Sequence, residues 1–153
     1  MVRQTTSSED KSYEALKAAL DRDHAMMLAR LQGLENSIQA GESARRLTEL
    51  FNDLIEQARF HMQAEEAQLA EAGFSELADH RAEHVRQMAE LTEAGLTLSA
   101  RHDETDWRDL ADFARHWVVN HIVRDDAFLG SLANAPSGNT TEVAGAEAQK
   151  AAE

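Results

Sequence analysis

Five histidines in this chain lie where their spacing could build a metal site. They are His24, His61, His80, His84 and His121. Glu65 follows His61 by four residues, and His84 follows His80 by four residues. Residues four apart on a helix share one face, with Cβ atoms about 5–6 Å apart. Each of these two pairs could therefore present two donor atoms to the same interior point.

The heights of these residues along the expected helices are stronger evidence than either pair. An isolated HxxxH or HxxxE pair on an acidic helix often arises by chance, and a lone histidine on an apolar stripe is usually a core residue. Expected turns near residues 41, 73 and 103 place the five histidines and Glu65 within about one helical turn of one level. Four separate helices rarely align in this way by accident. We therefore predict a buried cluster.

A buried cluster of imidazoles and carboxylates needs compensation, because each polar group loses its hydration on burial. Bound metal would supply that compensation. The chain has no cysteine, so the ligands are nitrogen and oxygen atoms, and they are too many for one tetrahedral zinc site. The set suits two five- or six-coordinate ions bridged by carboxylates. These ligand types are compatible with iron and leave manganese, zinc and copper open.

Four helices are expected to position these residues. Apolar residues recur every three or four positions in four runs, which predicts helices over 11–39, 44–71, 75–100 and 106–132. Gly41 before Ser43, and Gly73 before Ser75, are typical of a helix end followed by an N-cap. Short links favour antiparallel neighbours, so we predict an all-α, up-down-up-down, antiparallel four-helix bundle.

The same pattern predicts how the chain is divided. We expect a flexible N-terminus at 1–10, one bundle domain at 11–133, and a disordered tail at 134–153, where core-forming side chains are almost absent. A chain of 153 residues is long enough to bury the core of one such domain.

The charge of the chain argues against two classes of partner. A formal net charge of −13 would repel phosphate backbones and anionic lipid headgroups, so we expect no nucleic acid and no membrane partner. The segment "MVRQTTSSEDKS" lacks the apolar core of a signal peptide, and no stretch approaches the ~18 apolar residues of a membrane span. We therefore expect a cytoplasmic location. The sequence leaves the oligomeric state open and is compatible with a monomer.

Two acidic residues are candidates to work with His121. In "HIVRDD" (121–126), Asp125 lies four residues after His121 and would share its face on an ideal helix. Asp126 lies five residues after His121 and would be rotated by about 140°.

The full set of motifs resembles the hemerythrin family, specifically bacterial hemerythrins with an HHE cation-binding domain. The resemblance rests on His24 in the first helix, "HMQAE" (61–65) in the second, "HRAEH" (80–84) in the third and "HIVRDD" (121–126) in the fourth. It covers roughly residues 12–132. Ferritin-like di-iron proteins instead use ExxH motifs, and none of the seven histidines here has a Glu three residues before it.

The resemblance implies a buried di-iron site with seven protein ligands. They are His24, His61, Glu65, His80, His84, His121 and Asp126. Glu65 and Asp126 would be bridging carboxylates, and an oxo or hydroxo bridge would complete the pair of iron ions (Fe2+/Fe3+). The family spacing selects Asp126 over Asp125. That choice requires a π-like or distorted turn after His121 and leaves Asp125 as a solvated or supporting residue.

The two irons would have unequal ligand sets under this resemblance. His80, His84 and His121 would hold one iron. His24 and His61 would hold the other iron, which would keep an open coordination position for O2.

The function implied is reversible O2 binding by a carrier, store or delivery protein that is not an enzyme. Azide and other small anions would act as ligand analogues. Apolar neighbours of the ligands, such as Leu28, Ala58 and Val118, favour this function because a dry pocket offers bound O2 no added proton donor. Two alternatives stay open: a di-iron enzyme acting on peroxide, NO or O2, and an O2- or redox-sensing module.

Several other polar residues have simpler interpretations. Candidates to accept a hydrogen bond from a ligand histidine are Gln57, Glu76 and Gln87. Glu66, beside Glu65, is expected to be solvated, and His102 and His116 are expected to be surface histidines.

Overall fold

The computed structural model describes residues 8–99 and 104–133, which form four α-helices. These are α1 (Ser8–Gln39), α2 (Ala44–Glu71), α3 (Leu77–Ser99) and α4 (Glu104–Ala133). The predicted tail at 134–153, most of the predicted N-terminal segment, and His102 lie outside the described residues. The apolar periodicity of the sequence predicted all four helices, including both ends of α2.

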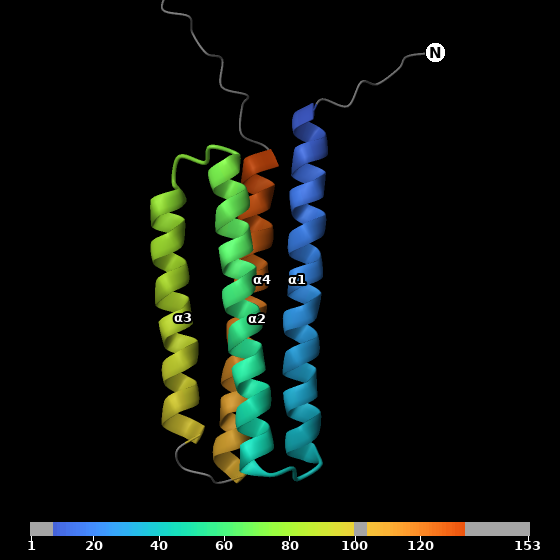
Figure 1. The fold of residues 1–153 in the computed structure, drawn as a ribbon, viewed down its shortest axis with the longest axis vertical. Helices are drawn as coiled ribbons and strands as arrows, with labels where there is room; N and C mark the ends of the chain where they lie inside the picture. Colours follow the sequence, from blue (N-terminus) through green and yellow to red (C-terminus); the bar gives the residue numbers. More distant parts are fainter. Residues whose placement is uncertain (1–7, 100–103, 134–153) are drawn as a thin grey trace, which may run out of the picture.

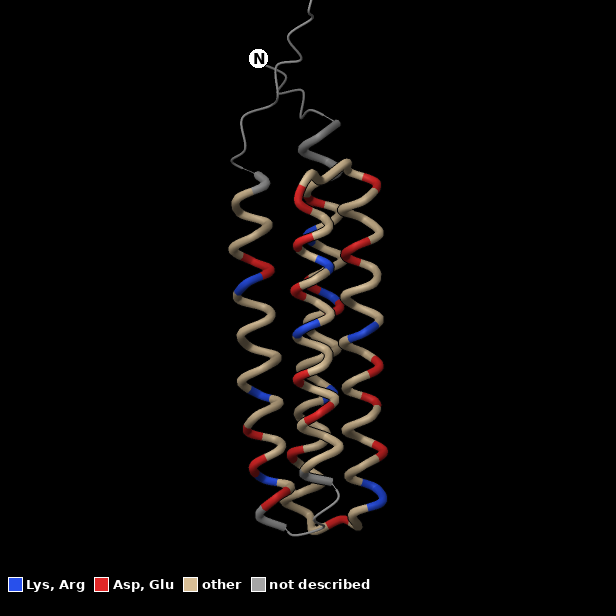
Figure 2. Tube along the Cα trace, turned by 90° about the vertical axis from the view of Figure 1, so that its left-hand side faces the viewer, with Lys and Arg blue, Asp and Glu red and all other residues tan. Residues whose placement is uncertain are grey.

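The helices run alternately up and down and form the predicted antiparallel bundle (Figure 1). Each helix packs against two neighbours, so the order around the bundle is α1, α2, α3, α4 and back to α1. Acidic residues recur along the helices in the view turned by 90° (Figure 2). Within the described ranges, none of the helices combines the length and the apolar character needed to cross a membrane.

The turn between α1 and α2 follows from its local sequence. Gly41 has a φ of 68°, a conformation that glycine adopts without steric cost. Ser43 then caps α2, because its side-chain oxygen accepts a hydrogen bond from the Arg46 backbone N–H at 3.3 Å. These residues reverse the chain within a few positions and place α1 against α2.

The turn between α2 and α3 differs from its prediction in one detail. Gly73 has a φ of 71°, as expected for a residue that ends a helix. However, α3 begins at Leu77, two residues later than predicted. The first backbone hydrogen bond of α3 runs from the His80 N–H to the Glu76 carbonyl oxygen at 3.1 Å. Glu76, and not Ser75, therefore precedes the first helical residue.

An apolar core fills the half of the bundle that lies next to the α1–α2 turn. Its buried members are Met27, Leu31, Leu34, Ile38, Leu47, Phe51, Leu54, Ile55, Ala58, Met62, Leu91, Trp107, Leu110, Ala111, Ala114, Trp117 and Val118. Phe51 packs so closely on α3 that a Cβ atom at Gly95 would overlap its ring. Toward the other end of the bundle, Leu20, Leu69 and Leu129 are also buried. A polar layer lies between these two apolar regions.

Candidate metal centre

The structure brings the five predicted histidines together at one level of the bundle. Ring centroids are 4.7 Å apart for His24 and His61, and 5.1 Å apart for His61 and His121. The His84 ring lies 5.7 Å from His121 and 4.3 Å from His80. Four of the five residues are buried, and the His80 side chain is 16 % exposed. Every helix contributes at least one ring to this histidine cluster.

Glu65 on α2 is fully buried and faces three of these rings. Its Oε1 lies 3.0 Å from His80 Nε2, and its Oε2 lies 3.5 Å from His84 Nε2 and 3.8 Å from His61 Nε2. Burial alone would raise the pKa of this carboxyl, but the imidazoles of His80 and His84 hold the pKa below its usual range. Glu65 is therefore an ionised oxygen donor between histidines of α2 and α3.

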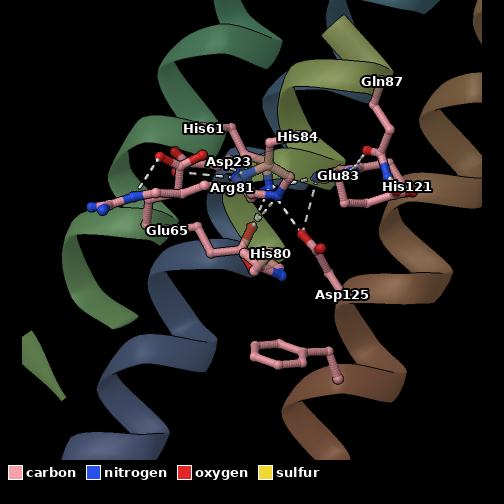
Figure 3. Close-up of polar contacts among 12 residues, drawn as sticks. Asp23, His61, Glu65, His80, Arg81, Glu83, His84, Gln87, His121 and Asp125 are labelled. Atoms are coloured by element: carbon pink, nitrogen blue, oxygen red, sulfur yellow. Dashed lines mark hydrogen bonds and ion pairs between the residues drawn. The ribbon is translucent and has the colours of Figure 1, made fainter. Parts of the chain in front are cut away.

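Asp125 on α4 faces the remaining rings. Its Oδ2 lies 2.9 Å from His24 Nε2, 3.0 Å from His61 Nε2 and 3.1 Å from His121 Nε2. Burial would raise the pKa of Asp125, but hydrogen bonds with these histidines hold the pKa well below its usual range. Figure 3 shows Asp125 and Glu65 reaching the same group of histidines from different helices.

The structure departs from the expected role of Asp126. Asp126 is exposed, whereas Asp125 is buried at 3 % exposure. The expected distorted turn is not present, because α4 is a continuous α-helix from Glu104 to Ala133. In a regular helix the residue four positions after His121 shares its face, and the residue five positions after it does not. Asp126 instead lies at the solvent edge of the cluster.

Two of the rings are held in the orientation that a metal ligand needs. His84 Nδ1 lies 2.8 Å from Glu66 Oε1, and His121 Nδ1 lies 2.9 Å from Gln87 Oε1. The Gln87 side-chain nitrogen donates to Glu83 Oε1 at 2.9 Å, so the oxygen of its amide faces His121. The neutral form of each ring therefore donates its proton from Nδ1 and directs the Nε2 lone pair into the cluster.

These contacts revise the predictions for supporting residues. Gln87 accepts from a ligand candidate as predicted, but Glu66 contacts His84 and is not simply solvated. Glu66 follows Glu65 by one position, about 100° around the helix, so it faces α3. Gln57 is buried, and its side-chain nitrogen has no hydrogen-bond partner among the described residues. Glu76 is exposed at the start of α3.

Unpaired buried atoms test whether cations fit the cluster. Among the described residues, His84 Nε2 and Glu65 Oε2 are buried without a hydrogen-bond partner, and they face each other at 3.5 Å. Leaving a buried polar atom unpaired costs about 1–3 kcal/mol. A cation between these two atoms would satisfy both of them. The donor chemistry, imidazole nitrogen with carboxylate oxygen, also suits iron.

Three groups of donors have ligand atoms that lie within 4.8 Å of one another, and two of the groups are fully buried and overlap. The third group combines buried His24 with the exposed Asp21 and Asp126. One buried group contains His24, His61, His121 and Asp125. The other buried group contains Glu65, His84, His121 and Asp125. Two adjacent groups that share residues can hold two neighbouring ions. The side chains present therefore have the donor chemistry of a metal site.

Apolar residues also lie close to the cluster. Ala58 and Val118 are fully buried, and the Trp117 ring stacks on His121 at a centroid distance of 5.6 Å and an interplanar angle of 12°. Leu28 does not contribute to this shell as expected, since it is 41 % exposed. A pocket of about 170 Å³ between α3 and α4 reaches His121 from the solvent side.

The part of the chain that carries the cluster is similar to known proteins. Residues 16–132 match the family model described as "Hemerythrin HHE cation binding domain". A bacteriohemerythrin from Methylococcus capsulatus is 24% identical over 115 residues, which cover 75% of this chain and 86% of the relative. No solved structure matches the chain significantly. The matched segment contains every residue of the cluster.

Proposed function

We propose a function from one premise: this chain belongs to the hemerythrin family of HHE cation-binding domains. The proposed function is reversible binding of O2 at a non-heme pair of iron ions, in a protein that carries, stores or delivers O2. The observation that carries the proposal is the pair of overlapping, buried donor groups at one level of the bundle. The similarity to a bacteriohemerythrin supports it.

The proposal assigns the histidines to two irons. His80, His84 and His121 would hold one iron, and His24 and His61 would hold the other. Ring distances support two pairs of this division, since His80 lies 4.3 Å from His84 and His24 lies 4.7 Å from His61. His121 belongs to both buried donor groups, and its assignment to the first iron follows the family pattern. The iron with two histidines would have one ligand fewer, which leaves it the open position.

We assign the bridging positions to Glu65 and Asp125. Glu65 faces His80 of the first set at 3.0 Å and His61 of the second set at 3.8 Å. Asp125 approaches His24, His61 and His121, which also belong to both sets. Asp125 takes the place that the family spacing gave to Asp126, because Asp126 is exposed.

The side chains around the proposed site suit binding better than catalysis. The iron pair, when bound, supplies the electrons that O2 takes up and returns. Ala58 and Val118, which lie three residues before His61 and His121, are fully buried and apolar. Glu65 and Asp125 are assigned here as metal ligands, so neither is free to give a proton to a bound ligand. A dry site without an added acid favours release of O2 unchanged.

A di-iron enzyme acting on peroxide, NO or O2 is a second candidate. It is favoured by the pocket between α3 and α4, which reaches His121 and is lined by Arg86, Asn120 and Arg124. Such a pocket could admit a substrate, although it approaches the three-histidine set and not the proposed open position.

Metal analysis and O2 titration test the proposal. The protein should contain two irons per chain, and the reduced protein should gain an absorption spectrum with O2 that disappears under vacuum. Zinc in place of iron, or an irreversible spectral change, would contradict reversible O2 binding. Steady turnover with peroxide or NO would favour the enzyme.

Two bulky variants test which iron has the open position. Met27 is fully buried three residues after His24, and Met88 lies four residues after His84. Met27→Trp should slow or block azide binding to the ferric protein while both irons remain bound, and Met88→Trp should interfere less. The reverse result would move the open position to the three-histidine iron.

A further inference from the structure

We propose that Glu66 and Gln87 are positioning residues that give His84 and His121 unequal strength as metal ligands. The inference rests on the proposed function, because it assigns both histidines to one iron. Both residues contact the ring nitrogen that faces away from the cluster. They differ in charge, since one is a carboxylate and the other is a neutral amide.

Glu66 reaches from α2 to a histidine on α3. Its Oε1 lies 2.8 Å from His84 Nδ1, and its Oε2 lies 3.4 Å from Arg81 Nε. The two oxygens therefore contact different partners, which orients the carboxylate. His84 itself is buried at 3 % exposure. A charge-assisted hydrogen bond in such a site is about twice as strong as one between neutral groups.

Gln87 on α3 contacts a histidine of the next helix, α4, just as Glu66 on α2 contacts a histidine of α3. Its Oε1 lies 2.9 Å from His121 Nδ1, and its Nε2 donates to Glu83. The backbone oxygen of Gln87 also accepts from Trp117 Nε1 at 2.9 Å, and the Trp117 ring stacks on His121. His121 is therefore held in place by two groups that both depend on Gln87.

The two contacts have different consequences for the metal. An acceptor on Nδ1–H increases the electron density that Nε2 can donate, and a carboxylate does so more than an amide. His84 should therefore be the stronger donor. Stronger donation stabilises ferric iron over ferrous iron, so the charge on Glu66 should lower the reduction potential. His61 has no comparable acceptor on its Nδ1 atom among the described residues, because the nearby Asp23 Oδ2 lies 3.6 Å away, beyond hydrogen-bond length.

The positioning part can be tested on metal-free protein by NMR of the histidine ring nitrogens. At about pH 9, where neutral imidazole dominates, wild-type His84 and His121 should both carry the proton on Nδ1. Glu66→Leu should remove this preference at His84 only, and Gln87→Leu should remove it at His121 only. Both variants should bind Co2+ about tenfold more weakly or worse. Unchanged tautomers and unchanged Co2+ affinity would overturn the positioning role.

The donor-strength part needs variants that keep the hydrogen bond. Glu66→Gln removes the charge but keeps an acceptor, and Gln87→Glu adds a charge at an acceptor. The midpoint potential of the iron-loaded protein should rise in the first variant and fall in the second. A tenfold change in the preference for ferric iron corresponds to about 59 mV for one electron. A purely structural role would leave both potentials unchanged.

Exposed positions supply controls with the same change in net charge. Glu93→Gln on α3 and Gln63→Glu on α2 alter residues that point to solvent, so their potentials should move much less. Equal shifts in the controls would overturn the inference while leaving O2 binding by the wild-type protein intact. A wild-type protein that takes up no pair of irons would overturn the proposed function and this inference together.

Discussion

The apolar core and the histidine cluster occupy adjacent levels of the same four helices, but they are stabilised in different ways. In the core, fully buried residues such as Leu34, Leu54 and Leu110 contact other apolar side chains and need no further partner. In the cluster, polar groups are buried as deeply, and His84 Nε2 and Glu65 Oε2 lack hydrogen-bond partners. The core can therefore fold through its own contacts, whereas the cluster depends on bound cations or protons.

Metal removal should have the largest effect and should separate the two regions. Ions that bind only the folded chain stabilise it by about 4 kcal/mol when present at 1,000 times their Kd. We expect the metal-free protein to keep its helical circular dichroism but to melt roughly 10 °C lower or more. Hydrogen exchange should accelerate around residues 61–65 and 80–87 and stay slow around 47–54. Loss of all helix on metal removal would show that the core does not fold by itself.

A cavity in the core should have the opposite signature. Leu54 is fully buried, so Leu54→Ala should destabilise the protein by about 2–5 kcal/mol in urea unfolding. The loss should be similar with and without metal, and the iron content should not change. Leu96→Ala is a matched control, because Leu96 is 71 % exposed and its truncation should have little effect. A Leu54→Ala protein that also loses iron would show that the two regions are not independent.

The four helices, their antiparallel packing and the level of the histidines could be predicted from the sequence, because these features depend on repeating patterns. Apolar spacing placed four helices, and their short connections implied antiparallel packing. Counting residues from each turn then placed the five histidines at one level, which the ring distances bear out for His61 and His121 at 5.1 Å. Such predictions need only the rise of a helix and the position of its turns.

Single side chains were harder to predict, since their contacts depend on the rotation of one helix against another. The choice of Asp126 required a distorted turn after His121, whereas α4 is regular in the structure and Asp125 lies in the cluster. Which of the two aspartates binds metal stays a prediction. Glu66 was predicted to be solvated because it lies beside Glu65 on another face of α2, but its partner His84 comes from α3. Leu28 looked like part of the pocket wall, but it lies on the outer side of α1.

The adjacent aspartates provide a smaller and sharper test within the cluster. Asp125→Asn should weaken binding of at least one iron by about tenfold or more, because it replaces a proposed bridging carboxylate with an amide. Asp126→Asn should leave the iron content and the charge-transfer bands nearly unchanged, since Asp126 is exposed. The two variants remove the same charge from neighbouring positions, so each controls for the other. Loss of the charge-transfer bands in Asp126→Asn alone would show that Asp126 is the metal ligand, as the family spacing implies, and that α4 is distorted after His121 when metal is bound.

The smallest effect concerns the pH dependence of the metal-free protein. Burial would raise the pKa of Asp125, but the facing histidines hold this pKa below its usual range. Ionised Asp125 therefore stabilises the folded protein above about pH 4, and this stabilisation is lost as the pH falls through the folded-state pKa. Burial would lower the pKa of His84, but Glu65 and Glu66 raise it. His84 therefore adds stability below about pH 6.5, which is lost as the pH rises through its raised pKa. Metal-free protein should be most stable between about pH 4 and 6.5.

The metal-loaded protein should show the opposite slope above this range. Histidines must lose their protons to bind metal, so metal affinity and stability should rise between about pH 6.5 and 8 while the metal-free protein becomes less stable. Urea unfolding of both forms at several pH values measures the two slopes. Leu54→Ala is the control, because an uncharged core residue should shift both curves without changing either slope. Parallel curves for the two forms would mean that protons do not take the place of cations in the cluster, and that the cluster, like the core, is held by packing alone.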